Sequence, residues 1–303
     1  MNQYDLYPSG PTVAIIDKYR GLYPETKPNA LISYARSEMS YELIINEHKT
    51  IKKRQGDAGT FTIFNNPDKL KSVTFEGYVA FAKICKQYGV EQIFTYDLDF
   101  TRDGFATNRD YLEKMEAEGL DPIPVVHDPY GDEVKHYMDH GYQLIAIGSQ
   151  EIGSASVDEL HYIVEEYRRN NVNVHFLGCT SFKKLASLPV ISSDSSSWTQ
   201  SGAVWDKILW WNEDEPGEDK TDSVVVADRL SPARKKNYYR RYPFLRKFEE
   251  YLDRELKLTI DDFNRRDLSA KERRLNKEVA NLHYYLKMEQ EIRKKHREQG
   301  FTF

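Results

Sequence analysis

The sequence has little cysteine and no long apolar stretch. Its 303 residues include two cysteines, Cys85 and Cys179, which lie far apart and have no CxxC motif or Cys/His cluster beside them. We therefore expect neither a zinc site nor a disulfide framework. No stretch comes near the roughly 20 apolar residues that a membrane-spanning helix needs, and the N-terminus lacks the basic-then-apolar pattern of a signal peptide. These absences predict a cytoplasmic protein with no membrane partner.

Helical patterns alternate with short apolar runs along most of the chain. Apolar residues recur at helical spacing within 75–85, 111–115 and 157–167. Eight apolar runs separated by such patterns predict an α/β protein, a (β/α)8 TIM-like barrel with a C-terminal helical appendage. An open doubly wound sheet is the alternative, but no GxGxxG follows any run and no P-loop motif occurs. The predicted strands are 30–34, a weak one ending at 56–59, 92–96, 123–126, 144–147, 174–177, 189–191 and 223–226.

The two ends of the chain depart from this alternation. Residues 1–29 hold four prolines among tyrosines, so we predict an irregular lead-in there. Residues 30–230 are the predicted barrel and catalytic domain, with the acidic stretch 212–219 as a surface loop before the last strand. From 231 to 303 the pattern is helical only, which predicts the appendage.

Charge is distributed unevenly between the same parts. Residues 229–303 carry 21 Lys and Arg against 12 Asp and Glu, whereas residues 1–228 carry 22 against 36. A basic tail on an acidic body indicates contact with a polyanion, and a solvated helical hairpin rich in both signs is the alternative. Tyrosines interleave with basic residues early in the tail, which suits phosphate contact and base stacking as well as simple packing onto the barrel. The predicted nucleic-acid-binding residues are Arg234, Lys235, Lys236, Arg240 and Arg241.

Several predicted strands end in a carboxylate. Residues 189–191 give way directly to Ser192-Ser193-Asp194 and a serine-capped helix, as where a barrel presents a carboxylate at its catalytic rim. Capping of that helix is the alternative role for Asp194. Because residues that follow parallel strands share one rim of a barrel, we expect these side chains to converge. The other rim positions hold Asp57, Asp97 with Asp99, His127 with Asp128, Gly148 with Ser149, and Gly178 with Cys179.

A set of carboxylates at one rim indicates two kinds of chemistry. Without a soft metal-ligand set, it favours acid–base and nucleophilic work on a glycosidic bond. Magnesium held by Asp97, Asp99 and Asp128 is the competing interpretation, since hard oxygen ligands suit that ion.

The motifs at these positions resemble the tRNA-guanine transglycosylase superfamily. The similarity spans about residues 30–200, in the family's order, and each motif is weak alone. Ser193-Asp194 falls where the family has its nucleophilic aspartate. The other matches are GDAGTFT (56–62) to the DSGGFQ or DSGAFS loop, FTYD (94–97) to a strand ending in FD, VVH (125–127) to a VQG-like strand, AIGS (146–149) to LAVGE, and HFLG (175–178) to YLMGVG.

The departures from the family pattern narrow the resemblance. The tRNA enzymes carry a Cys3His zinc site that this chain cannot form. Ala58 replaces a serine, His127 a glutamine, and Ser149-Gln150 a glycine-glutamate pair. The chain lacks the zinc region and has a basic tail. For both reasons it resembles more closely the compact phage and bacterial relatives that insert 7-deazaguanines into DNA.

The resemblance implies a base-exchange enzyme of the queuine tRNA-ribosyltransferase type. It would replace guanine in a nucleic acid, DNA in preference to tRNA, with a 7-deazaguanine. Asp194 would form a covalent ester with the sugar, Asp57 would act as general acid and base, and Asp97 would bind the base. The other predicted substrate-binding residues are His127, Gly148, Ser149 and Gly178.

The same resemblance sets the expected partners. We expect no cofactor and no metal; the partners are a nucleic acid, the free 7-deazaguanine base and accessory proteins that open the strands. A barrel N-glycosidase or nucleosidase, in which water resolves the ester, is one alternative. A non-catalytic nucleic-acid-binding barrel protein is the other.

Overall fold

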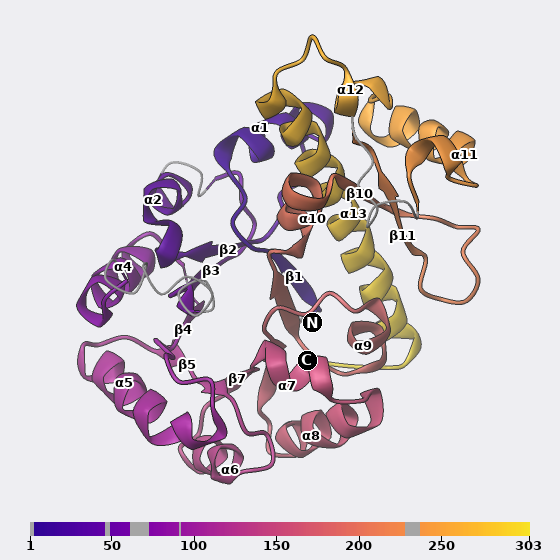
Figure 1. The fold of residues 1–303 in the computed structure, drawn as a ribbon. Coiled ribbons are helices and arrows are strands. Elements are labelled where there is room, and N and C mark those ends of the chain that lie inside the picture. Colours follow the sequence, from indigo (N-terminus) through magenta and orange to yellow (C-terminus); the bar gives the residue numbers. More distant parts are fainter. Residues whose placement is uncertain (1–2, 46–48, 61–72, 91, 228–236) are drawn as a thin grey trace. The chain divides into compact units, whose positions relative to one another are not determined.

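The computed structural model describes residues 3–45, 49–60, 73–90, 92–227 and 237–303 (Figure 1). The chain divides into two compact units. Unit 1 comprises Met1–Pro11, Lys27–Ser195 and Ile292–Phe303. Unit 2 comprises Thr12–Thr26 and Ser196–Glu291. These boundaries differ from the predicted divisions at residues 29 and 230.

Unit 1 is a mixed α/β structure with two parallel sheets, which confirms the predicted class. The sheets have the strand orders β1-β9-β8-β7-β6 and β2-β3-β4-β5, and every pairing within them is parallel. The strands are β1 (Asp5–Pro8), β2 (Ala30–Ser33), β3 (Arg54–Asp57), β4 (Gln92–Phe94), β5 (Pro122–Ile123), β6 (Val125–Val126), β7 (Leu144–Ile147), β8 (Asn173–Phe176) and β9 (Ser192–Ser195).

The two sheets are bridged at their edges and contribute side chains to one apolar core. Ser9, just after β1, forms a parallel bridge with Leu31 in β2, and the Gly10 amide donates to the Leu31 carbonyl at 3.0 Å. Between β5 and β6 stands only Pro124, which has no N–H to continue the ladder. One apolar cluster takes side chains from strands of both sheets: Tyr7, Leu31, Phe94, Ile123, Val125 and Ala146.

Helices follow most strands and lie outside them in Figure 1. In α4, side chains at helical spacing are buried, from Tyr78 to Cys85, and the Thr74 hydroxyl caps the first turn through the Gly77 amide. The Ser156 and Glu159 side chains form a capping box at α8. The helices of unit 1 are α2 (Ser37–Ile45), α4 (Phe75–Gln87), α5 (Phe105–Ala117), α6 (Asp132–Asp139), α7 (Ser149–Ser154), α8 (Val157–Arg169) and α9 (Phe182–Ser187).

Unit 2 joins helices to one antiparallel hairpin. The buried Asn281 side chain donates to the carbonyls of Trp198 and Lys207 and accepts from the Leu209 amide, so it ties α13 to α10 and β10. The elements are α1 (Val13–Leu22), α10 (Ser197–Trp205), β10 (Lys207–Trp211), β11 (Thr221–Val225), α11 (Leu245–Tyr251), α12 (Asp261–Asn264) and α13 (Ala270–Glu298), whose last residues belong to unit 1. No helix in the described ranges is long and apolar enough to cross a membrane.

Three local predictions are wrong. Residues 1–29 contain β1 and α1 rather than an irregular lead-in, because β1 is completed by pairing with β9. The strand expected at 189–191 is Ser192–Ser195, whose serines are buried by neighbouring strands. The run 223–226 lies in an antiparallel pair with β10, so it is not a strand of the parallel sheets. The acidic loop at 212–219 is confirmed as the connection within this hairpin.

Candidate active site

Three aspartates gather where parallel strands of unit 1 end. Asp57 is the last residue of β3, Asp97 follows β4, and Asp194 lies in the last half of β9. Asp97 and Asp194 are buried. Asp57 is partly exposed as a residue, but its carboxyl group is surrounded by protein. The charges of Asp97 and Asp194 both act on the Asp57 carboxyl. The structure thus brings together the three carboxylates that the sequence singled out.

The Asp57 carboxyl titrates near neutrality. Burial raises its pKa to about 7, with further contributions from the charges of Asp97 and Asp194, against the opposing effect of the Gly59 and Ala58 amides. The Gly59 amide donates to Oδ2 at 2.9 Å. Gly59 has a φ of +80°, and a Cβ there would lie 2.4 Å from the Ala35 Cβ, so the turn requires glycine. A carboxyl with this pKa can both give and take a proton at pH 7.

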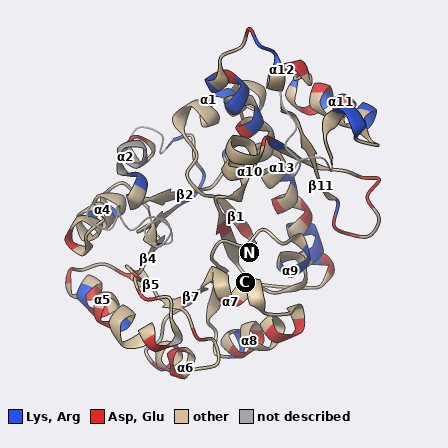
Figure 2. Cartoon of the chain, viewed as in Figure 1, with Lys and Arg blue, Asp and Glu red and all other residues tan. Residues whose placement is uncertain are grey.

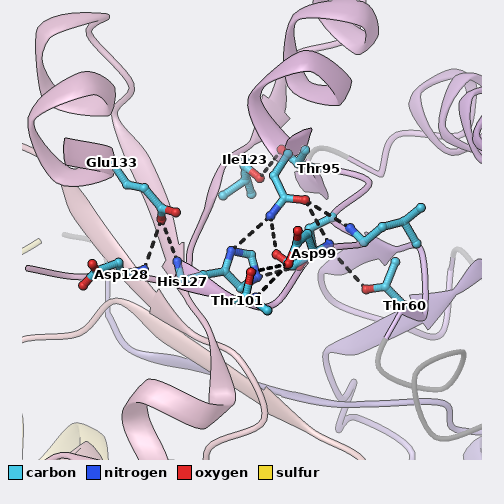
Figure 3. A network of polar contacts seen from close by, with 11 residues as sticks. Thr60, Thr95, Asp99, Thr101, Ile123, His127, Asp128 and Glu133 are labelled. Carbon is cyan, nitrogen blue, oxygen red and sulfur yellow. Dashed lines mark hydrogen bonds and ion pairs between the residues drawn. The ribbon is translucent and has the colours of Figure 1, made fainter. Parts of the chain in front are cut away.

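The Asp97 carboxylate is held by two side chains, one on each oxygen. The Thr60 hydroxyl donates to Oδ1 at 3.1 Å, and His127 Nε2 lies 3.2 Å from Oδ2 (Figure 3). Both oxygens keep a second lone pair, because a carboxylate oxygen accepts more than one hydrogen bond. Asp97 can therefore accept two further bonds from a ligand.

His127 is fixed on its other side by an amide. Asn108 Nδ2 lies 3.4 Å from His127 Nδ1 and also donates to the Asp99 carbonyl, while its Oδ1 accepts from the Leu98 and Asp99 amides. This orientation turns an N–H toward Nδ1, so the ring proton sits on Nε2 and faces Asp97. Burial lowers the pKa of His127, but the bond and charge of Asp97 outweigh it and the net pKa is raised.

Asp194 is held through one oxygen. Its Oδ1 accepts from the Gly178 amide at 3.1 Å and lies 3.3 Å from His175 Nε2. Gly178 has a φ of +64°, and a Cβ there would lie 3.0 Å from the Ser149 Cβ. Glycine therefore permits both the left-handed turn and the close approach of Ser149. The predicted pair Gly178 and Ser149 lies beside the nucleophile candidate.

Gly148 lies beside His127. A Cβ at Gly148 would stand 3.7 Å from His127 Cδ2 and 2.7 Å from Glu151 Oε2. His127 and Gly148 thus lie on the Asp97 side of the site, and Gly178, with Ser149 against it, lies on the Asp194 side.

Several site residues were missed by the sequence analysis. They are polar residues of strands, turns and helices, and the fully buried His175 in β8 is the clearest case. A histidine at an inward position of a strand was the available signal. The others are Gln55, Thr60, Asn108 and Glu133, whose Oε2 accepts from the His127 amide at 2.7 Å (Figure 3).

The magnesium interpretation finds no support in the placement of its ligands. Asp99 Oδ1 accepts from the Thr101 amide and hydroxyl, and Asp128 Oδ1 accepts from the Tyr130 amide, so both serve local turns. Within the described ranges no three His, Cys, Asp or Glu side chains are placed to hold a metal ion.

The predicted nucleic-acid-binding residues are described only in part. Arg234, Lys235 and Lys236 lie outside the described residues. In unit 2, Arg240 and Arg241 are exposed, and the Arg240 guanidinium stands 5.4 Å from the centre of the Tyr239 ring.

The neighbouring tyrosines correct one expectation. Tyr238 and Tyr242 are buried, and Tyr242 donates to Asp222 and accepts from Trp210 Nε1. These two rings pack within unit 2, so the prediction that they stack on nucleic-acid bases is wrong. The nearby helix α11 carries charges of both signs (Figure 2).

No family model and no curated protein matches the chain. Among solved structures the chain is similar to a point mutant of FabK from Thermotoga maritima, with 12% sequence identity and a TM-score of 0.39. That match covers 98% of this chain and 96% of the other. A likeness of this degree assigns neither a family nor an activity.

Proposed function

We propose that the protein exchanges a base in a nucleic acid, replacing guanine with a 7-deazaguanine through a covalent ester between Asp194 and the sugar. The observation that carries the proposal is the convergence of three carboxylates at strand ends, where burial and the charges of Asp97 and Asp194 raise the pKa of Asp57 to about 7. A glycosidic bond is cleaved by one carboxylate as nucleophile and a second as acid.

We take the strands that carry these residues as one (β/α)8 barrel. In this interpretation β1 is the first strand, and β5 and β6 together form one strand interrupted at Pro124. The bridge between Ser9 and Leu31 and the core shared by both sheets support it. A barrel gathers the ends of its strands at one rim, where enzymes of this architecture place their catalytic residues.

The first half-reaction uses Asp194 and Asp57. Both hydrogen bonds described for Asp194 end on Oδ1, so we assign the attack on C1′ to Oδ2. The Oδ2–C1′ bond forms as the C1′–N9 bond breaks, and the bonding electrons leave with guanine. Protonated Asp57 supplies the proton that the departing base takes up.

The second half-reaction reverses these roles. The incoming 7-deazaguanine gives its N9 proton to the Asp57 carboxylate, and N9 then attacks C1′ and releases Asp194. Because the ester conserves the energy of the glycosidic bond, no cofactor is needed.

In this proposal, Asp97 and its neighbours recognise the base. The N1–H and exocyclic amine of guanine form a donor pair that a carboxylate matches. Thr60 and His127 orient that carboxylate, and Gly148 leaves room beside His127. The target base must leave the duplex to be reached, so accessory proteins that open the strands are part of the proposal. The preference for DNA over tRNA as the substrate stays a prediction, as does the cytoplasmic location.

Guanine exchange tests this function. The protein is incubated with radiolabelled guanine and either a single-stranded DNA oligonucleotide or tRNA, while released base is followed separately. We expect label to enter DNA without net release of base. Release without incorporation would mean that water resolves the ester, as in an N-glycosidase. Binding with neither event would leave the non-catalytic alternative.

A further inference from the structure

We propose that His175 is a positioning residue for Asp194: its Nε2–H holds Oδ1 and thereby points Oδ2 at the sugar. The inference rests on the proposed function, because it concerns the same nucleophile. His175 touches neither substrate nor reacting atoms in this scheme and acts only through Asp194.

The sheet register explains why the histidine reaches the aspartate. His175 in β8 is the register partner of Ser192 in β9. Residues two apart on a strand face the same side, so Ser192 and Asp194 lie on one face of β9. The imidazole spans both, with Nδ1 2.8 Å from Ser192 Oγ and Nε2 3.3 Å from Asp194 Oδ1.

We assign the ring tautomer from the contacts of Nδ1. Gln55 Nε2 lies 3.5 Å from His175 Nδ1 and also donates to Gln92 Oε1 at 2.7 Å. The Ser192 hydroxyl, at 2.8 Å, donates to the single lone pair of Nδ1, and the Gln55 N–H is a longer second contact to the same atom. The ring proton then sits on Nε2, where it can be donated to Asp194.

The ring has no room to turn away. His175 is fully buried, and the rings of Phe94 and Tyr7 lie with their centres 4.9 Å and 6.4 Å from its own. A second donor, the Gly178 amide, shares Oδ1. Two fixed donors on one oxygen stop rotation of the carboxylate, so the other oxygen stays oriented for the attack.

This arrangement predicts a defect in turnover rather than in binding. In both half-reactions the Oδ2–C1′ bond is made or broken, so a carboxylate free to rotate slows both. The base is bound by Asp97, which His175 does not contact. Loss of the Nε2–H donor should therefore lower kcat and leave KM for guanine nearly unchanged.

The test compares His175→Leu with His175→Gln in the full chain. Leucine keeps apolar volume but has no donor, whereas glutamine places an amide N–H near the position of Nε2. We expect kcat for guanine exchange to fall roughly 10- to 100-fold in His175→Leu, the usual effect of losing a hydrogen bond to a charged group. We expect His175→Gln to recover most of it, with KM within about twofold in both.

The controls separate this inference from the proposed function. If the unaltered protein exchanges no guanine, the proposed function fails. If it does, and folded His175→Leu keeps its kcat or His175→Gln is as slow as His175→Leu, the positioning role is overturned. Should His175→Leu fail to fold, Ser192→Ala takes its place by removing the hydroxyl at Nδ1. A severalfold lower kcat at constant KM then supports the role, and an unchanged kcat overturns it.

Discussion

At the scale of single residues, three aspartates differ in their surroundings, and the differences support the roles proposed for them. Asp57 is raised in pKa to about 7, which suits proton transfer. Asp97 is held on both oxygens by Thr60 and His127, which suits binding a donor pair. Among the described residues, the hydrogen bonds of Asp194 all end on Oδ1, which suits a nucleophile. In the proposed mechanism, one residue type serves three functions in one site.

Asp194→Asn should abolish exchange and leave the fold intact. An amide is too weak a nucleophile to form the ester, so we expect kcat to fall at least about 10³-fold. Asp99→Asn is the matched control, since Asp99 serves a turn through Thr101, and it should keep near-normal kcat. Near-normal exchange by Asp194→Asn would show that the nucleophile is another group.

Asp57 should make stability depend on pH. Its pKa is about 7 in the folded protein against an ordinary 3.8, so between these values the folded state holds a proton that the unfolded chain has lost. This contribution is fully present below pH 3.8 and is lost as the pH rises through 7. Asp57→Asn cannot ionise, so it should gain stability over the unaltered protein at pH 8, on the order of 2 kcal/mol allowing for partial exposure.

Denaturant melts of both proteins at pH 4 and pH 8 check the effect of Asp57→Asn on stability. The difference between them should grow with pH, while exchange by the variant is lost. A difference that is the same at both pH values would mean that the pKa of Asp57 is not raised.

At the scale of elements, strong apolar patterns were predictable and polar strands were not. Residues 144–147 form β7 at the expected bounds, because an apolar run between helical patterns has few other structures available. The strand β9 reads Ser-Ser-Asp-Ser, and no sequence pattern marks such residues as buried. Its burial arises from pairing with β1 and β8, which are distant in sequence.

The site was predictable to a similar extent. The convergence of Asp57, Asp97 and Asp194 could be predicted because each lies at or near the end of a strand, and parallel strands bring their ends together. His175 could not be assigned, since its partners Ser192 and Asp194 are set by the register between strands. That register is a property of the folded sheet rather than of any short segment.

The pairing of β1 with β9 should contribute measurable stability. The Tyr4 hydroxyl lies 2.6 Å from Ser193 Oγ, and both residues are buried. Tyr4→Phe should therefore lower the free energy of unfolding by about 1 kcal/mol, since it leaves a buried hydroxyl without this partner. Tyr162→Phe on α8 is the control, because Tyr162 is 68% exposed and should show almost no change. Equal stability of all three proteins in urea would argue against β1 as a stabilising strand.

At the scale of the whole molecule, charge separates the tail from the rest. Residues 229–303 carry the excess of Lys and Arg, and the preceding residues carry the excess of Asp and Glu. If the protein binds a nucleic acid as proposed, long-range attraction to phosphates comes mainly from the tail. The burial of Tyr238 and Tyr242 confines the predicted contact there to charge and to Tyr239.

Replacing the five tail residues with glutamine should flatten the salt dependence of DNA binding. Each lost phosphate contact lowers the slope of log affinity against log salt by about 0.7–0.9. Exchange on a saturating short substrate should change less, because the aspartates stay in place. The control replaces Lys114 and Lys135, two lysines on helices of unit 1, and should keep the slope. An unchanged slope in the variant with all five replacements would contradict a role of these residues in binding nucleic acid. The five residues are Arg234, Lys235, Lys236, Arg240 and Arg241.

The covalent ester on Asp194 is the most direct test of base exchange by this protein. A guanine-containing oligonucleotide is mixed with the protein, the reaction is quenched with acid, and the digested peptides are analysed by mass spectrometry. We predict a sugar adduct on the peptide that contains Asp194, which disappears when 7-deazaguanine is added before the quench. An adduct on another residue, or none while guanine is exchanged, would contradict the proposed mechanism.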